Sequence, residues 1–173
     1  MAVATMSLAG CANPTASTTA VPTWELANAE PYAPIPLGRA RLSFDRPLPR
    51  HLVTPLCQEY SLVVIRTAKD WAEIQRRLDL PALPPSVDLD NGCIVGLIAN
   101  VGESADGRWP IRLRCLRRSG TQGSLDAAFS PGLYYPLLAA AYVDLVHAPG
   151  IHSIGLVTID RRQFIIRQVS SSH

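Results

Sequence analysis

Apolar residues in the second half of this chain occur in short runs that are either continuous or alternate with polar residues. Residues 93–99 form a continuous run, which is typical of a strand buried on both faces. Residues 111–116 alternate, which is typical of a strand with one face in solvent, and residues 102–107 between them predict a turn. This patterning predicts a β-rich domain.

Further strands are predicted on either side of these two. Residues 60–66 are short and rich in β-branched side chains, residues 40–44 alternate, and residues 124–129 give a weaker strand signal. Residues 154–159 and 163–169 form a closing pair joined at Asp160-Arg161-Arg162. Residues 139–147 are ambiguous, because their alanines favour a helix while Tyr142 and Val143 favour a strand.

One prominent helix is predicted over residues 68–78. Thr67 stands at the N-cap position, with Asp70 placed to return the capping interaction. Trp71, Ile74 and Leu78 form an apolar stripe at helical spacing, and a proline-rich stretch from Pro81 ends the helix. We expect Trp71 to pack on a sheet. The fold class is therefore α+β: a β-rich single domain with an antiparallel or mixed sheet and one prominent helix.

The residues before this domain are rich in proline, threonine, serine and alanine, which disfavours both a helix and a central strand. We expect a leader over residues 1–10, a disordered tether over 11–37 and the β-rich domain over 38–173. Trp24, Tyr32 and Ile35 are unusually apolar for a tether and could dock on the body.

Leu8-Ala9-Gly10-Cys11 resembles a bacterial lipobox. The resemblance implies cleavage before Cys11, a diacylglycerol on its thiol and a further acyl chain, such as palmitate, on its amine. Each buried methylene contributes roughly 0.8 kcal/mol and one chain alone binds marginally, so several chains make a durable anchor. Ala12 after the cysteine resembles the pattern of outer-membrane sorting, so the expected location is the cell envelope, on the periplasmic face of the outer membrane.

The residues before Cys11 also differ from an ordinary leader. A secretory leader begins with Lys or Arg and has an apolar core of about 7–15 residues. No Lys or Arg precedes Cys11, and fewer than ten apolar residues do. One interpretation is that these residues are the end of a longer leader. The other is a chance Leu-Ala-Gly-Cys in the alanine-rich start of a cytosolic protein.

The charge pattern argues against nucleic acid as a partner. The net charge is +2, with acidic and basic residues interspersed, whereas a nucleic-acid site needs basic residues gathered on one face. The nearest approach is a group of arginines that alternates with apolar residues, as on the solvent face of a strand: Arg112, Arg114, Arg117 and Arg118. No later run has the roughly 18–20 apolar residues of a membrane-spanning helix.

Three cysteines remain after Cys11. Cys115 alternates with apolar residues and is expected to face the core. Cys57 and Cys93 each lie near the start of a predicted strand, and a disulfide between them would stabilise the fold by roughly 3–4 kcal/mol. The alternative is that all three are free thiols. Their spacing does not form the close ligand pairs of a zinc site.

The order of features over residues 60–169 resembles the C-terminal domain of the PrcB-type protease-complex lipoproteins. The features are a strand ending at Arg66, a helix carrying Trp71, a proline-rich break, Val87-Asp88-Leu89, and the strand from Cys93. Leu89 stands where the family has an aromatic residue, and residues 105–109 stand at its Gly-Gly-Tyr turn. The resemblance implies an accessory, non-catalytic subunit, without a cofactor, that assists an envelope protease.

One set of residues offers a rival hypothesis, a small hydrolase or metal-dependent enzyme. His147 and His152 flank a Pro-Gly turn, so they could share a metal ion with Asp144 or Asp160. Their spacing is not a known ligand motif, and the chain lacks a Gly-x-Ser-x-Gly nucleophile elbow. The hypothesis requires His147, His152 and Asp144 to converge in a cleft.

Asp88 and Asp90 precede Asn91 and Gly92, as in part of a calcium-binding loop. The acidic ligand that such a loop needs several residues later is absent, because residues 93–99 are apolar. We therefore expect a turn in which the aspartates bond to their own backbone.

Some aromatic residues lie in predicted turns instead of strands. Arg108 and Trp109 are adjacent, and Leu133, Tyr134 and Tyr135 follow a Pro-Gly pair. Trp, Tyr and Arg dominate the hot spots of protein interfaces. We expect these residues to form a partner-binding surface; the alternative is that they only cover the sheet ends. The sequence thus favours a non-catalytic protein that binds another envelope protein.

Overall fold

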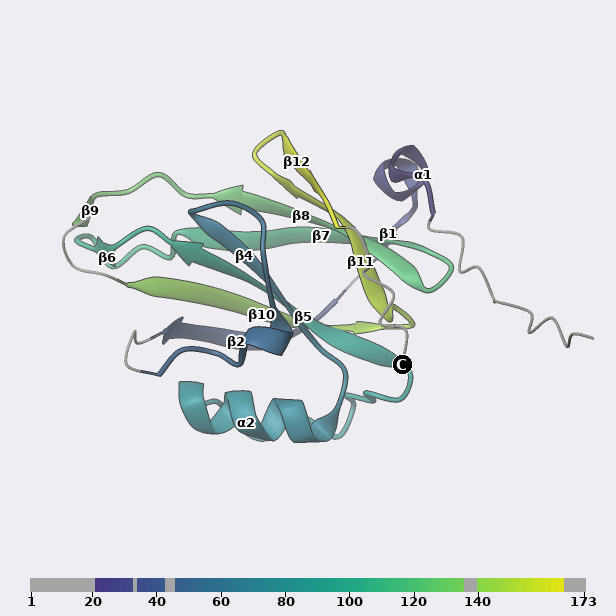
Figure 1. Cartoon of the computed structure of the whole chain (residues 1–173), viewed down its shortest axis with the longest axis horizontal. Helices are drawn as coiled ribbons and strands as arrows, with labels where there is room; N and C mark the ends of the chain where they lie inside the picture. The colour runs from purple at the N-terminus through teal and green to yellow at the C-terminus, as the bar shows by residue number, and fades with distance from the viewer. Residues whose placement is uncertain (1–20, 33, 43–45, 136–139, 167–173) are drawn as a thin grey trace, which may run out of the picture.

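The computed structural model describes residues 21–32, 34–42, 46–135 and 140–166, and shows two five-stranded sheets packed face to face (Figure 1). Cys11, the leader, and the last residues of the predicted strand 163–169 lie outside these ranges. The β-rich class predicted from the sequence is confirmed. The single expected sheet is instead divided into two, and a third, two-stranded sheet lies at one end.

The first large sheet, which we call sheet B, is antiparallel throughout, in the order β2-β10-β5-β4-β3. Its strands are β2 (Ile35–Leu42), β3 (Val53–Pro55), β4 (Tyr60–Ile65), β5 (Gly92–Asn100) and β10 (Ala141–Pro149). A 3-10 turn, η1 (Arg50–Leu52), precedes β3. The ambiguous residues 139–147 thus fall largely in a strand, because β10 pairs with both β2 and β5.

The second sheet, sheet A, has the order β1-β7-β8-β11-β12. Its strands are β1 (Pro31–Tyr32), β7 (Ile111–Ser119), β8 (Gln122–Phe129), β11 (Ser153–Ile159) and β12 (Arg162–Ile165). β8 and β11 are parallel, while the other pairs are antiparallel. Parallel neighbours need a crossover connection, and β10 of the other sheet supplies it here.

The central strands of sheet B, β5 and β10, are buried on both faces. The face toward sheet A forms one core, with Val95 and Leu97, and the face toward α2 (Ala68–Leu78) forms a second, with Ile94 and Ile98 (Figure 1). This explains why β5 is apolar without alternation. Gly96 points toward the second core but adds no side chain to it. A Cβ at that position would lie 2.5 Å from the Cδ2 atom of Leu145.

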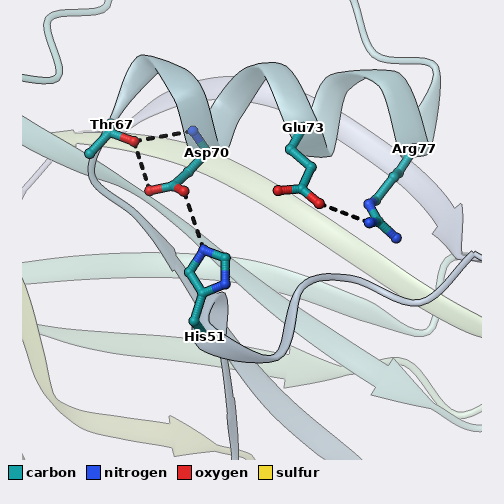
Figure 2. Close-up of polar contacts among 5 residues, drawn as sticks. All are labelled: His51, Thr67, Asp70, Glu73 and Arg77. Atoms are coloured by element: carbon teal, nitrogen blue, oxygen red, sulfur yellow. Dashed lines mark hydrogen bonds and ion pairs between the residues drawn. The ribbon is translucent and has the colours of Figure 1, made fainter.

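Helix α2 begins and ends where the sequence predicts. The Thr67 hydroxyl accepts a hydrogen bond from the Asp70 N–H at 3.1 Å and donates one to its carboxylate at 2.7 Å (Figure 2). Trp71 and Ile74 are buried against sheet B. Asp79 ends the helix in the left-handed conformation, with φ 52°, two residues before Pro81.

The prediction of a disordered tether is wrong for the described part of that segment, residues 21–32 and 34–37. Helix α1 (Thr23–Asn28), β1 and the start of β2 occupy this segment. Leu26 is 1% exposed, and its carbonyl accepts a hydrogen bond from the Ser124 hydroxyl at 2.9 Å. Tyr32 pairs with Leu116, as its apolar character suggested, but Trp24 is 64% exposed and does not dock. Tertiary contacts override the proline-rich composition here.

The prediction that Cys115 faces the core is wrong, because strand β7 contains a bulge. The pairing with β8 shifts between Leu113 and Cys115, so Arg114 is an extra residue in the strand. After this bulge Leu116 enters the core, and Cys115 lies half-buried outside it. Three of the four arginines of this strand are exposed as predicted, and Arg117 is half-buried, donating to the Ala29 carbonyl at 2.9 Å. Among the described residues, no helix is long and apolar enough to cross a bilayer.

Candidate functional site

A two-stranded sheet closes one end of the sandwich, away from α1 (Figure 1). β6 (Glu103–Ser104) follows β5 of sheet B, β9 (Tyr134–Tyr135) follows β8 of sheet A, and the two pair in antiparallel fashion. The turn predicted over residues 102–107 thus contains a short strand. This pairing brings together two chain segments that the sequence analysis linked only by their composition.

Aromatic rings pack beneath this small sheet. Trp109 meets Tyr142 edge-on, with ring centroids 5.0 Å apart, and Phe129 lies 5.9 Å from Tyr134. The Tyr142 hydroxyl accepts a hydrogen bond from the Ser104 N–H at 2.9 Å. These contacts form a packed aromatic base at this end of the sandwich.

The predicted partner-binding residues divide into two groups. Trp109 and Tyr134 are half-buried, and the Tyr134 hydroxyl donates to the Ser130 carbonyl at 2.9 Å. Leu133 is 74% exposed, Tyr135 is 55% exposed, and Arg108 is also exposed. We call these five residues the aromatic end. Its buried members support the fold, while its exposed members are free to contact another molecule.

The polar groups of this end hold its loop in place. The carboxylate of Asp106 accepts hydrogen bonds from the Ser104 hydroxyl at 3.0 Å and the Arg108 N–H at 3.2 Å. It also pairs with the Arg108 guanidinium at 3.2 Å. The backbone bond from Arg108 is the main reason why the pKa of Asp106 is lowered. Burial raises the pKa of Tyr134, and the charge of Asp106 adds to this effect.

The three residues of the hydrolase or metal-enzyme hypothesis do not converge. His147 lies on the face of β10 toward the loop that carries Asp88, whose carbonyl is 3.1 Å from its Nε2 atom. Asp144 stands an odd number of residues away on the same strand and so faces sheet A, while His152 is exposed beyond the turn. Within the described ranges, no three His, Cys, Asp or Glu side chains are placed to hold a metal ion.

Asp144 instead links the two sheets. Its Oδ2 atom accepts a hydrogen bond from the Leu113 N–H of β7 at 3.0 Å, and its Oδ1 atom accepts one from Arg39 of β2 at 3.2 Å. β1 pairs with β7 only at Leu116 and Arg117, so the Leu113 N–H has no strand partner on that edge. The buried carboxylate satisfies this donor.

Two of the other aspartates considered as ligands, Asp160 and Asp88, also have structural partners. Asp160 accepts a hydrogen bond from the Phe129 N–H at 3.0 Å, and Asp88 accepts one from the Asp90 N–H at 3.0 Å. The second contact is the backbone bond expected for a turn at residues 88–92.

No disulfide joins Cys57 and Cys93, and both are free thiols, as is Cys115. β4 runs antiparallel to β5 with Tyr60 opposite Ala99, so Cys57 lies near the end of β5 that is farthest from Cys93. Six strand residues span about 20 Å, whereas a disulfide needs Cα atoms within about 7 Å. Burial raises the pKa of the Cys93 thiol to about 11.

An apolar groove of about 540 Å³ lies on the face of sheet B that α2 packs against. No local sequence pattern predicts this groove, because its walls come from five separate segments of the chain. The one local signal is Pro47 and Pro49, which end the first predicted strand and so indicate an irregular segment; this segment forms part of the groove wall. The lining residues are Leu42, Pro47, Leu48, Arg50, Val53, Pro55, Ser61, Ile98, Asn100 and Ala141.

Comparison with known proteins identifies no relative: no protein-family model, curated protein or solved structure matches this chain.

Proposed function

We propose that this protein is a cell-envelope lipoprotein, anchored at Cys11, that binds another envelope protein through the aromatic end. It acts as a non-catalytic, accessory subunit. The observation that carries the proposal is the exposure of Tyr135, which pairs with Glu103 in the β6–β9 sheet, and of Leu133, which directly precedes β9. Tyr135 and Arg108 are of the residue types that dominate interface hot spots, and Leu133 adds exposed apolar surface near Tyr135.

The packing of this end supports the proposal. The Trp109–Tyr142 and Phe129–Tyr134 contacts anchor the segments that carry Arg108, Leu133 and Tyr135, so less of the backbone must be ordered when a partner binds. Arg108 adds a cation beside the apolar pair, which would favour a partner surface with an exposed carboxylate.

The partner that we propose is an envelope protease, on the basis of the resemblance to PrcB-type lipoproteins over residues 60–169. The anchor agrees with this role, because only about ten residues separate Cys11 from the first described residue, Val21. Ten extended residues span at most about 35 Å. The folded domain would therefore stay close to the membrane and to membrane-bound partners.

A capture experiment tests the binding surface. The full chain, solubilised with detergent from its own membranes, should capture a partner that the double variant Leu133→Ser, Tyr135→Ser no longer captures. Ile165→Ser is the matched control, since Ile165 is 64% exposed but lies on β12, outside the aromatic end. Equal capture by the double variant and the wild type would contradict the proposal.

Cell fractionation tests the anchor. With its natural start, the wild type should be found with membranes, and Cys11→Ser should be released into the soluble fraction. A soluble wild type would contradict lipidation, whatever the capture experiment gives.

A further inference from the structure

We infer that the apolar groove binds a single-chain anionic amphiphile, such as a fatty acid, with the acyl chain inside and the acidic head at Arg50. This inference does not depend on the anchor or on the protein partner.

The groove exists because the cover of sheet B is incomplete. α2 has 11 residues and is about 16 Å long, while β5 has 9 residues and is about 30 Å long. The segment before β3 runs beside α2 and is tied to it by a bond from Arg77 to the Pro47 carbonyl at 2.5 Å. Residues of this segment, and none of α2, form the outer wall of the groove.

The walls suit a hydrocarbon chain. Ile98, Ala141, Leu42 and Val53 line the groove from strands of sheet B, and Leu48 lines it from the segment before β3. A methylene group occupies about the volume of a water molecule, roughly 30 Å³. A groove of about 540 Å³ therefore accommodates a chain of roughly 12 to 16 carbons with imperfect packing. Water gains few hydrogen bonds from such walls.

The polar groups of the lining select the head group. Arg50 is exposed and lines the groove, and among the described residues no carboxylate lies within ion-pair distance of it. Asn100 and Ser61 are the other polar side chains among the described lining residues, and neither carries a charge. Among the described residues the groove has one cation and no anion in its lining, which matches a carboxylate on an alkyl chain.

Calorimetric titration of the complete, non-acylated chain with dodecanoate tests this inference. Dodecanoate should bind with one site and at least tenfold more tightly than dodecyltrimethylammonium, which has the same chain with a cationic head. Hexanoate should bind too weakly to measure, because it fills less than half of the groove. Dodecanoate that does not bind, or a cation that binds equally well, would overturn the inference.

Two variants locate the site. Arg50→Gln should weaken dodecanoate binding about tenfold, the loss expected for one charge-assisted bond, and leave the cationic amphiphile unaffected. Arg76→Gln is the matched control, because Arg76 is an exposed arginine of α2 outside the groove. Ser61→Phe should fill the groove and abolish binding, whereas equal affinity in a folded Ser61→Phe protein would overturn the inference. If that variant does not fold, dodecanoate-induced amide shifts in the wild type decide: shifts at Ile98 and Asn100 support the site, and their absence refutes it.

Discussion

At the scale of single residues, side chains that the sequence suggested as metal ligands or catalytic groups have structural roles instead. Asp144 and His147 belong to one strand but face opposite layers, so their spacing in sequence does not bring them together. Asp144 satisfies the free backbone donor of β7, a need that arises only when the two sheets meet. No local pattern could have predicted that pairing.

The helix cap gives a pH-dependent prediction. The hydrogen bond from the Thr67 hydroxyl is the main reason why the pKa of Asp70 is lowered (Figure 2). The His51 Nε2 atom, 3.3 Å from the Asp70 Oδ1 atom, lowers it further. A lowered pKa stabilises the fold above the ordinary carboxyl pKa, about 3.9, and this contribution is lost as the pH falls through the folded-state pKa. Asp70→Asn should therefore cost about 0.5–1 kcal/mol at pH 7 and progressively less below pH 4. Urea unfolding at several pH values measures this, and a constant difference would contradict it.

The cysteines give a prediction about reactivity. The Cys93 side chain is fully buried and its pKa is raised to about 11, so little of its nucleophilic thiolate exists at pH 8. In the native protein, iodoacetamide should modify the half-buried Cys57 well before Cys93. Peptide mass mapping measures both rates. A Cys57–Cys93 linked peptide in a non-reducing digest would disprove the free-thiol state.

At the scale of elements, local signals predicted the exact bounds of α2, and they predicted β4, β5, β7, β8 and β11 with bounds that differ by a few residues. The cap of α2, its apolar stripe and its proline stop all lie within the helix or next to it, so its bounds follow from the sequence. α1 has no side-chain cap bond and only six residues, too few for a stable isolated helix. It forms because Leu26 is buried on sheet A, a contact with residues about 100 positions away.

Two substitutions in α1 test this explanation. Leu26→Ala should cost about 2–5 kcal/mol, as expected for a buried leucine. Trp24→Ala, in the same helix but with an exposed side chain, should change stability by less than about 0.5 kcal/mol. Denaturant unfolding gives both values. Equal and small effects would mean that α1 does not pack on the sheet in solution.

The contact of α2 with sheet B gives a larger effect. Trp71 is buried in the second core, so Trp71→Ala should cost about 3–5 kcal/mol. A loss below 1 kcal/mol in equilibrium unfolding would show that this face of the helix is exposed.

At the scale of the whole molecule, the sequence predicted a β-rich domain but not its division into layers. Strand periodicity reports which faces are buried, and β5 is buried on both. It does not report which strands are neighbours, because pairs such as β8 and β11 or β6 and β9 join distant segments. The aromatic end follows from one such pairing, and the apolar groove from the short length of α2 beside β5.

The central claim is that the aromatic end is the surface that meets a partner. Site-specific photocrosslinking in intact cells tests it most directly, with benzoylphenylalanine placed singly at Leu133, Tyr135 or Ile165. We expect one adduct of the same size from positions 133 and 135, and none from position 165, which is also apolar and exposed. No adduct at 133 and 135, or an equal adduct at 165, would contradict it.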